Sequence, residues 1–298
     1  MSDKVPLILD TDIGSDIDDA VCLTYLLAEP RCELLGVTTV TGQSRERAML
    51  ADAICRAAGR EHVPIWSGCD VPILGEQKQP QAPQAEVLSR WAHREDFEPY
   101  EAVDFLRRAI RSRPGEVTLL TIGPLTNVGV LFAMDPDVAR LLRRLVMMGG
   151  YYFAPGQKEW NTMGDPIASA RVFGAPVPEL VAYGLDVTLK CTMAADECRK
   201  RFQGGPFEVV RDMAEVWYRD RPAITFHDPL AAVCAFEPAI CTYRTGRVTM
   251  DLSGGPAHGA TLFEESPAGP HRVAQDVSPA CFFARYFGVT ASFSEQSG

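Results

Sequence analysis

The chain has 298 residues, of which 46% are hydrophobic and 23% charged, a composition typical of a globular protein with a sizeable core. Its net charge of -10 argues against nucleic acid or an anionic membrane as partner, and leaves a small molecule as the expected ligand. The nine cysteines form no CxxC pair, and no apolar run reaches the ~20 residues of a bilayer span. We therefore expect reduced thiols and a cytoplasmic protein without a membrane segment.

The most informative stretch is residues 7–20, LILDTDIGSDIDDA, in which five aspartates follow a short apolar run. The apolar run predicts a buried strand, and the apolar spacing after it predicts a helix. The carboxylates would lie at the carboxyl end of a strand, where open α/β sheets bind ligands. Two carboxylates ~4 Å apart repel by roughly 4 kcal/mol at an effective dielectric of ~20. A bound cation would compensate this repulsion, and a cluster with only oxygen ligands suits Ca²⁺ or Mg²⁺. Helix capping by Asp18 and Asp19 is the alternative, and it would explain only some of the five aspartates.

Strand and helix patterns then alternate along the chain. Apolar and β-branched runs predict strands at 33–40, 63–66, 117–122, 145–148 and 180–183. Helical periodicity predicts helices at 44–58, 100–111, 127–133, 166–173, 194–202, 206–218 and 227–236. Three strand-like pieces (247–252, 259–263, 272–277) precede a last helix at 279–287. This order predicts a single domain over residues 1–298, an open, mostly parallel, doubly wound α/β sheet of the Rossmann-like kind with helices on both faces.

Residues 70–99 interrupt this alternation with a polar, proline-rich excursion. A segment of this length inside a compact domain is either a lid or a solvated insertion, and both interpretations stay open.

Polar groups also follow several of the other predicted strands. They are Gly42-Gln43, Ile122-Gly123, Met148-Gly149 with Glu159 and Asn161, and His227-Asp228. Each has an ordinary interpretation as a tight turn, an exposed loop or a helix cap before proline. Together they would place carboxylates, amides and one imidazole around one crevice. The Asp10-Thr11-Asp12 pattern also resembles the nucleophile of haloacid-dehalogenase phosphatases, but no acidic pair follows a later strand as that chemistry needs.

In order and spacing, these motifs resemble the inosine–uridine preferring nucleoside hydrolase family, from about Pro6 to the end of the chain. The matching motifs are the acidic turn, VTTVTG (37–42), GPLTN (123–127), MMGG (147–150), EWN (159–161) with Asp165-Pro166, GLDVT (184–188) and HDP (227–229). The resemblance implies Ca²⁺-dependent hydrolysis of the N-glycosidic bond of ribonucleosides, giving ribose and free base in nucleoside salvage. The bond would break through an oxocarbenium-like state, which an anionic crevice favours.

The resemblance also implies a role for each site residue. The implied metal ligands are Asp12, Asp19, the carbonyl oxygen of Ile122, and Asp228. The implied substrate contacts are Asp18, Gln43, Met148, Glu159 and Asn161. Two residues would be catalytic, Asp12 as base for the attacking water at the ion and His227 as acid for the leaving base. Supporting positions are Asp10 and Asp16.

The sequence departs from the family pattern at three places. The acidic turn is longer than usual because it contains Gly14-Ser15-Asp16-Ile17. The base is therefore either Asp12 or Asp16, and the Asp-x-Asp spacing of Asp10 and Asp12 favours Asp12. Gln43 stands where the family usually has Asn, and residues 77–96 lack the family's second histidine. Base preference and leaving-group activation are therefore open.

Two alternatives remain beside the standard hydrolase. One is an N-ribosyl hydrolase with a non-standard substrate, and the other is a catalytically silent pentosyl-binding protein. Because family members usually form dimers or tetramers, we expect a homodimer or homotetramer.

Overall fold

The computed structural model describes residues 4–295, and its centre is a large mixed sheet. The strands of this sheet are β1 (Val5–Thr11), β2 (Cys32–Thr39), β3 (Ile65–Ser67), β4 (Thr118–Thr121), β5 (Arg144–Met148), β6 (Leu180–Tyr183), β9 (Cys241–Met250), β10 (Thr261–Glu265) and β11 (His271–Val277). Their spatial order is β10-β9-β11-β6-β5-β4-β1-β2-β3. All neighbours from β3 to β11 pair in parallel, while β9 is antiparallel to both β11 and β10. The predicted mostly parallel, doubly wound sheet is confirmed.

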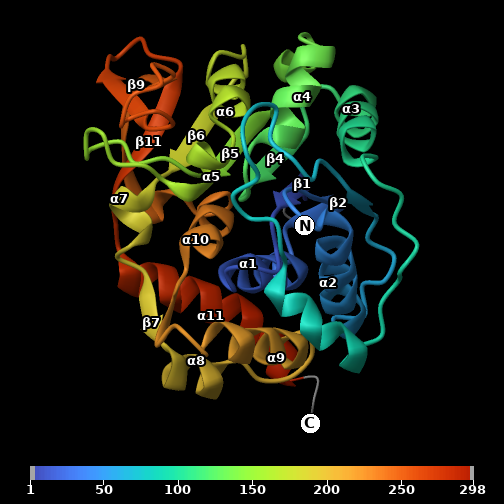
Figure 1. Cartoon of the computed structure of the whole chain (residues 1–298). Coiled ribbons are helices and arrows are strands. Elements are labelled where there is room, and N and C mark those ends of the chain that lie inside the picture. Colours follow the sequence, from blue (N-terminus) through green and yellow to red (C-terminus); the bar gives the residue numbers. More distant parts are fainter. Residues whose placement is uncertain (1–3, 296–298) are drawn as a thin grey trace.

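Helices cover both faces of this sheet (Figure 1). One face carries α3 (Ala102–Ser112), α4 (Thr126–Met134) and α6 (Pro166–Phe173). The other carries α1 (Asp18–Ala28), α2 (Ser44–Ala57), α9 (Phe207–Trp217), α10 (His227–Cys234) and α11 (Pro279–Glu295). Because side chains alternate along a strand, β1 contributes to both cores: Leu7 and Leu9 pack under α1, and Ile8 packs on the opposite side.

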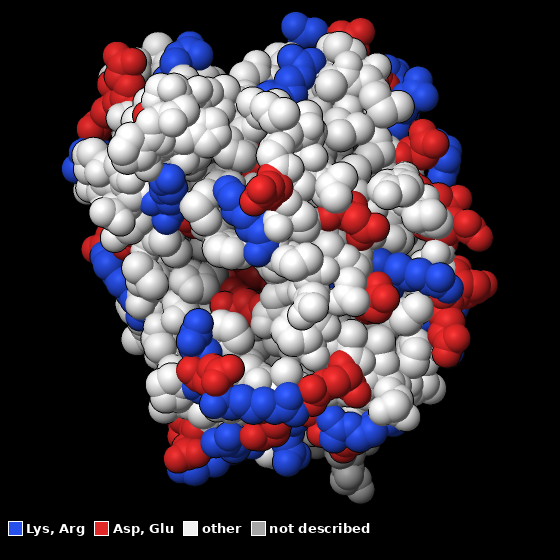
Figure 2. Space-filling view, in the orientation of Figure 1, with Lys and Arg blue, Asp and Glu red and all other residues white. Residues whose placement is uncertain are grey.

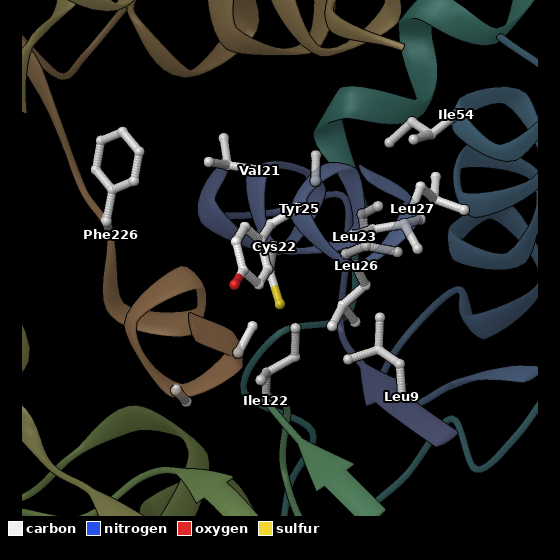
Figure 3. Packing of buried hydrophobic residues seen from close by; sticks show 14 of the residues in the cluster. Leu9, Val21, Cys22, Leu23, Tyr25, Leu26, Leu27, Ile54, Ile122 and Phe226 are labelled. Atoms are coloured by element: carbon white, nitrogen blue, oxygen red, sulfur yellow. The ribbon is translucent and has the colours of Figure 1, made fainter. Parts of the chain in front are cut away.

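Helix α1 lies inside the molecule, and its residues from Asp18 to Leu27 are all buried. Figure 3 shows its apolar side chains between Leu9 of β1, Ile54 of α2 and Phe226, which precedes α10. A helix that is apolar on nearly every side is typical of a buried element. Packing from all sides therefore fixes the direction of α1 and the place of its acidic first turn.

The structure differs from the sequence predictions mainly in short elements. A 3₁₀ helix, η1 (Pro83–Arg90), forms within the excursion, and α5 (Trp160–Gly164) forms where a loop was expected. The predicted helix at 194–202 is α8 (Ala195–Arg201), and it follows β7 (Thr192–Ala194), which pairs with β8 (Ala223–Thr225) in a separate small sheet. Strand β9 begins before the predicted 247–252, and α11 runs beyond residue 287. The remaining short helices are η2 (Val138–Leu141), α7 (Leu185–Thr188) and η3 (Pro238–Ile240).

None of the helices within residues 4–295 combines the length and the apolar character that crossing a bilayer requires.

Candidate active site

A cavity of about 400 Å³ opens at the carboxyl ends of β1 and β4. This is where the strand order reverses, the usual ligand site of a doubly wound sheet. Figure 2 shows acidic side chains at the bottom of an opening near the middle of this face. The lining residues are Asp12, Ser15, Asp16, Asp18, Asp19, Gln79, Ile122, Met148, Glu159, Trp160, Asn161, Leu185, Trp217, Arg221, His227 and Asp228.

Three buried carboxylates converge on this cavity from two helices. Asp18 and Asp19 lie in the first turn of α1 and Asp228 lies in the first turn of α10, with one oxygen of each within 4.8 Å of the others. Asp18 Oδ2 accepts the backbone N–H of Asp228 at 3.0 Å, so that one aspartate caps the partner helix. The N-terminal ends of both helix dipoles favour negative charge at this point. Helix capping therefore uses one oxygen of Asp18, and it does not explain why Asp19 and Asp228 lie at the same point.

Burial and mutual repulsion raise the pKa of Asp18, Asp19 and Asp228 well above the usual range. A buried cluster of this kind needs either protons or a cation for compensation. Because its donors are all carboxylate oxygens, the cluster fits a hard cation such as Ca²⁺ or Mg²⁺. Asp12 lines the same cavity; burial raises its pKa, and the positive charge of Arg47 opposes that shift.

The predicted sugar-binding residues form a rigid wall. Glu159 accepts the backbone N–H groups of Gly150 at 2.8 Å, Asn161 at 2.7 Å and Thr162 at 3.0 Å, and it thereby caps α5. Asn161 Nδ2 donates to the carbonyl of Ile122 at 2.8 Å and approaches that of Met148 at 3.3 Å. These hydrogen bonds hold the Glu159 and Asn161 side chains at the cavity.

Two of the predicted site residues do not line the cavity. Asp10 is fully buried, and its Oδ1 accepts hydrogen bonds from Thr38 Oγ1 at 2.5 Å and Asn127 Nδ2 at 2.7 Å. Burial raises the pKa of Asp10 to about 7, and its hydrogen bonds link the end of β1 to β2 and α4. Gln43 is exposed, and its Oε1 accepts the backbone N–H of Ala82 at 2.7 Å. The structure thus places Gln43 outside the cavity, where it holds the excursion.

The other predicted residues reach the cavity in distinct ways. Asp16 lines it with one oxygen bound to the backbone N–H of Ile17 at 2.6 Å, and burial raises its pKa to about 6. His227 faces Thr188, whose Oγ1 lies 2.7 Å from Nδ1, which leaves Nε2 as the nitrogen free for a ligand. Removal from water lowers the pKa of His227 to about 4.

Sequence patterns did not identify several lining residues. Gln79 comes from the excursion; its side chain hydrogen-bonds the Asp12 carboxylate and accepts the indole N–H of Trp160. Trp217 and Arg221 come from α9 and the connection after it. Only the tertiary packing brings these residues to the cavity, and nothing in their local sequence distinguishes them from surface positions.

The buried Arg47 of α2 holds the lengthened acidic turn in place. Its guanidinium donates to the carbonyl of Asp12, to that of Ile13 at 3.1 Å and to that of Gly42 at 2.8 Å. A further donor reaches the carbonyl of Gln81 in the excursion at 2.9 Å. One side chain therefore joins the acidic turn, the end of β2 and the excursion.

The fold and the cavity define an α/β enzyme that binds a small ligand beside clustered carboxylates at the switch point of its sheet. The sequence model of the inosine-uridine preferring nucleoside hydrolases matches residues 7–284. The chain therefore belongs to this family, whose members are N-glycosyl hydrolases acting on ribonucleosides.

Individual relatives agree with this assignment. Uridine nucleosidase 1 of Arabidopsis thaliana is 29% identical over 269 residues, which cover 83% of this chain and 79% of that protein. The pyrimidine-specific ribonucleoside hydrolase RihB of Escherichia coli (strain SE11) is 29% identical over 285 residues, 88% of each chain. Among solved structures, the plant nucleoside hydrolase PpNRh1 has a TM-score of 0.84 at 24% identity, and covers 96% of this chain and 98% of its own. A purine-preferring ribonucleoside hydrolase from Gardnerella vaginalis has a TM-score of 0.84 at 22% identity, and covers 98% and 99%. The two structures support the fold.

Proposed function

We propose that the protein hydrolyses ribonucleosides with the help of a bound Ca²⁺, and that uridine is its preferred substrate. The convergence of Asp18, Asp19 and Asp228 at the bottom of one cavity is the observation that carries this proposal. The names of the uridine- and pyrimidine-directed relatives support the choice of base.

In this proposal Asp12, Asp19, Asp228 and the carbonyl of Ile122 hold the ion. Asp18 is close enough to share it, because its carboxylate lies within 4.8 Å of two of those groups. A bound Ca²⁺ would neutralise part of the acidic charge and lower the pKa of water beside it.

The protein's own residues would then perform the proton and positioning steps. Asp12 takes a proton from the attacking water, with Gln79 and Arg47 fixing its orientation. Glu159 and Asn161 bind ribose hydroxyls, and the remaining negative charge of the cavity stabilises the oxocarbenium-like transition state. His227 acts as a neutral imidazole, because its pKa is lowered to about 4. With the Thr188 hydroxyl donating to Nδ1, the imidazole proton lies on Nε2, which faces the leaving base.

The proposal also retains a homodimer or homotetramer in the cytoplasm. The nine cysteines are all unpaired thiols in the structure, which agrees with a reducing compartment. Light scattering of the purified protein would give the oligomeric state directly.

Ribose release from purified protein tests the proposed activity. We expect release from uridine, and less from inosine, cytidine, adenosine and guanosine, in a reducing-sugar assay. A calcium chelator should abolish it and added Ca²⁺ should restore it, while calorimetry should detect Ca²⁺ binding without substrate. Full activity after exhaustive chelation would contradict the metal proposal. Calcium binding without release from any nucleoside would contradict the substrate proposal and favour a silent pentosyl-binding protein.

A further inference from the structure

Arg221 is an unusual residue in this cavity. Among the lining residues within the described part of the chain, it is the one side chain with a permanent positive charge. It shares the cavity with a predominantly acidic set, Asp12, Asp16, Asp18, Asp19, Glu159 and Asp228. A single positively charged side chain beside six acidic residues indicates a role in binding a ligand.

The Arg221 side chain is exposed at the cavity and makes two contacts with the protein. The central carbon of its guanidinium lies 5.4 Å from the ring centroid of Trp217, whose indole N–H donates to the carbonyl of Ala223 at 2.9 Å. Its hydrogen bond within residues 4–295 is to the carbonyl of Asp220, at 3.3 Å. No carboxylate of the described residues lies within ion-pair distance of Arg221, whereas the neighbouring Arg219 pairs with Glu86. The charge of Arg221 is thus available to a ligand.

The position of Arg221 indicates which part of a nucleoside it would meet. Trp217, Arg221 and His227 belong to one continuous stretch, from the end of α9 to the start of α10, and all line the cavity. The proposed function gives His227 to the leaving base, whereas Glu159 and Asn161 belong to the sugar. On that assignment, the base lies on the side of the cavity that Trp217, Arg221 and His227 line.

We propose that Arg221 binds a carbonyl oxygen of the leaving base and stabilises the negative charge that develops there. The inference rests on the proposed hydrolase function and names its substrate class: ribosides of bases with a ring carbonyl, such as uracil and hypoxanthine. A base without a ring carbonyl, such as adenine, gains nothing from this contact.

The electron and proton balance of the step is simple. As the bond from C1′ to the base nitrogen breaks, its electron pair passes to the base and spreads onto the ring carbonyl oxygens. The oxygen of water bonds to C1′ and keeps one hydrogen as the anomeric hydroxyl, while the other water proton goes to Asp12. After the bond has broken, the departing base takes up one proton from the solvent by way of His227, and Asp12 releases its proton to the solvent, so that one water and no net proton is consumed. Arg221 stays protonated throughout, because a guanidinium does not lose its proton in this pH range.

A change of leaving group tests this role. Arg221→Gln should lower kcat/KM for uridine and inosine by about 10- to 100-fold, as expected for the loss of a charged hydrogen bond at a developing anion. With 4-nitrophenyl β-D-ribofuranoside, whose phenolate leaves without assistance, the same variant should lose less than about threefold, because Arg221 has little charge to stabilise. Arg221→Lys should retain part of the uridine activity.

Arg219→Gln is the matched control, because Arg219 is exposed on the same connection and pairs with Glu86 outside the cavity. It should keep wild-type rates on both substrates. An equal loss on uridine and nitrophenyl riboside, or no loss on either, in Arg221→Gln would overturn the role of Arg221 while leaving the hydrolase function intact. A wild-type protein that releases ribose from no nucleoside would overturn both proposals.

Discussion

At the scale of single residues, the acidic turn offers two carboxylates for the role of base. Asp12 is oriented by the side chain of Gln79 and by the backbone contacts of Arg47. Asp16 has one oxygen engaged by the N–H of the next residue, and it lies on the segment that lengthens the turn. Asp16 also has hydrogen bonds to Asp18, so the protein holds both carboxylates. We propose Asp12 as the base on the sequence register.

Asparagine variants distinguish these two residues. Asp12→Asn should lower kcat for uridine by at least about 1,000-fold, as is common for loss of a residue acting only in the transition state, because an amide accepts no proton from water. Asp16→Asn should lose less than about tenfold. Thermal melting should show that both variants fold, since neither loses a packed apolar group. A nearly inactive Asp16→Asn beside an active Asp12→Asn would transfer the role of base to Asp16.

Residue types explain how far the site could be predicted from the sequence. Asp18, Asp19 and Asp228 begin helices and Asp12 follows a strand, so their common position at one sheet edge was predictable. Gln43 was expected beside the substrate, but its left-handed backbone, with φ of 60°, turns the amide toward the excursion. Gln79 and Arg221 reach the cavity through contacts distant in sequence, which no local pattern encodes.

At the scale of elements, the long regular segments were predictable and the short ones were not. The strands β4, β5 and β6 are mostly apolar and buried along nearly their whole length, which is typical of strands covered on both faces. Helix α5 depends on capping by Glu159, and η1 depends on burial of Val87 and Leu88 under its neighbours. These short segments have little intrinsic stability, and tertiary contacts decide their conformation.

The junction between the acidic turn, α2 and the excursion gives a prediction at this scale. Arg47→Met should lower the free energy of unfolding by about 2–4 kcal/mol, because buried carbonyls lose their donor. Urea unfolding would measure this loss, and limited proteolysis should show faster cleavage of the excursion. Arg45→Met is the control: Arg45 is exposed on the same helix and binds the carbonyl of Glu95. Equal stability of the two variants would contradict the proposed role of Arg47.

At the scale of the whole molecule, the side chain of His271 on β11 links β9 to the end of α6 by hydrogen bonds. It lies buried on β11, where its Nδ1 accepts the N–H of Val248 of β9 at 2.8 Å. Its Nε2 lies 3.1 Å from the carbonyl of Phe173, at the end of α6. The neutral imidazole with its proton on Nε2 satisfies both contacts, whereas a second proton on Nδ1 would face an N–H group. Burial accordingly lowers the pKa of His271 below 6.5.

The sign of this shift gives a pH dependence. Because the folded state disfavours the protonated imidazole, the stabilisation by neutral His271 is complete above pH 6.5 and decreases as the pH falls below that value. The loss approaches about 1.4 kcal/mol per pH unit at most. His271→Asn keeps an acceptor for Val248 but cannot titrate, so its free energy of unfolding should fall less than that of the wild type between pH 6.5 and 5. The exposed His62→Asn serves as control. Parallel curves for wild type and His271→Asn would refute this assignment.

The hydrogen bond between Asp18 and Asp228 spans 210 positions of the sequence. On the ribosome, the first four strands and α1 emerge long before α10 is synthesised, so the nascent chain carries the acidic turn without its partner helix. The contacts of α1 with α10 and α11 therefore form only after the last quarter of the chain has been synthesised. A chain that ends before α10 would lack Asp228 and the helix that packs beside α1, so it would not form the carboxylate cluster.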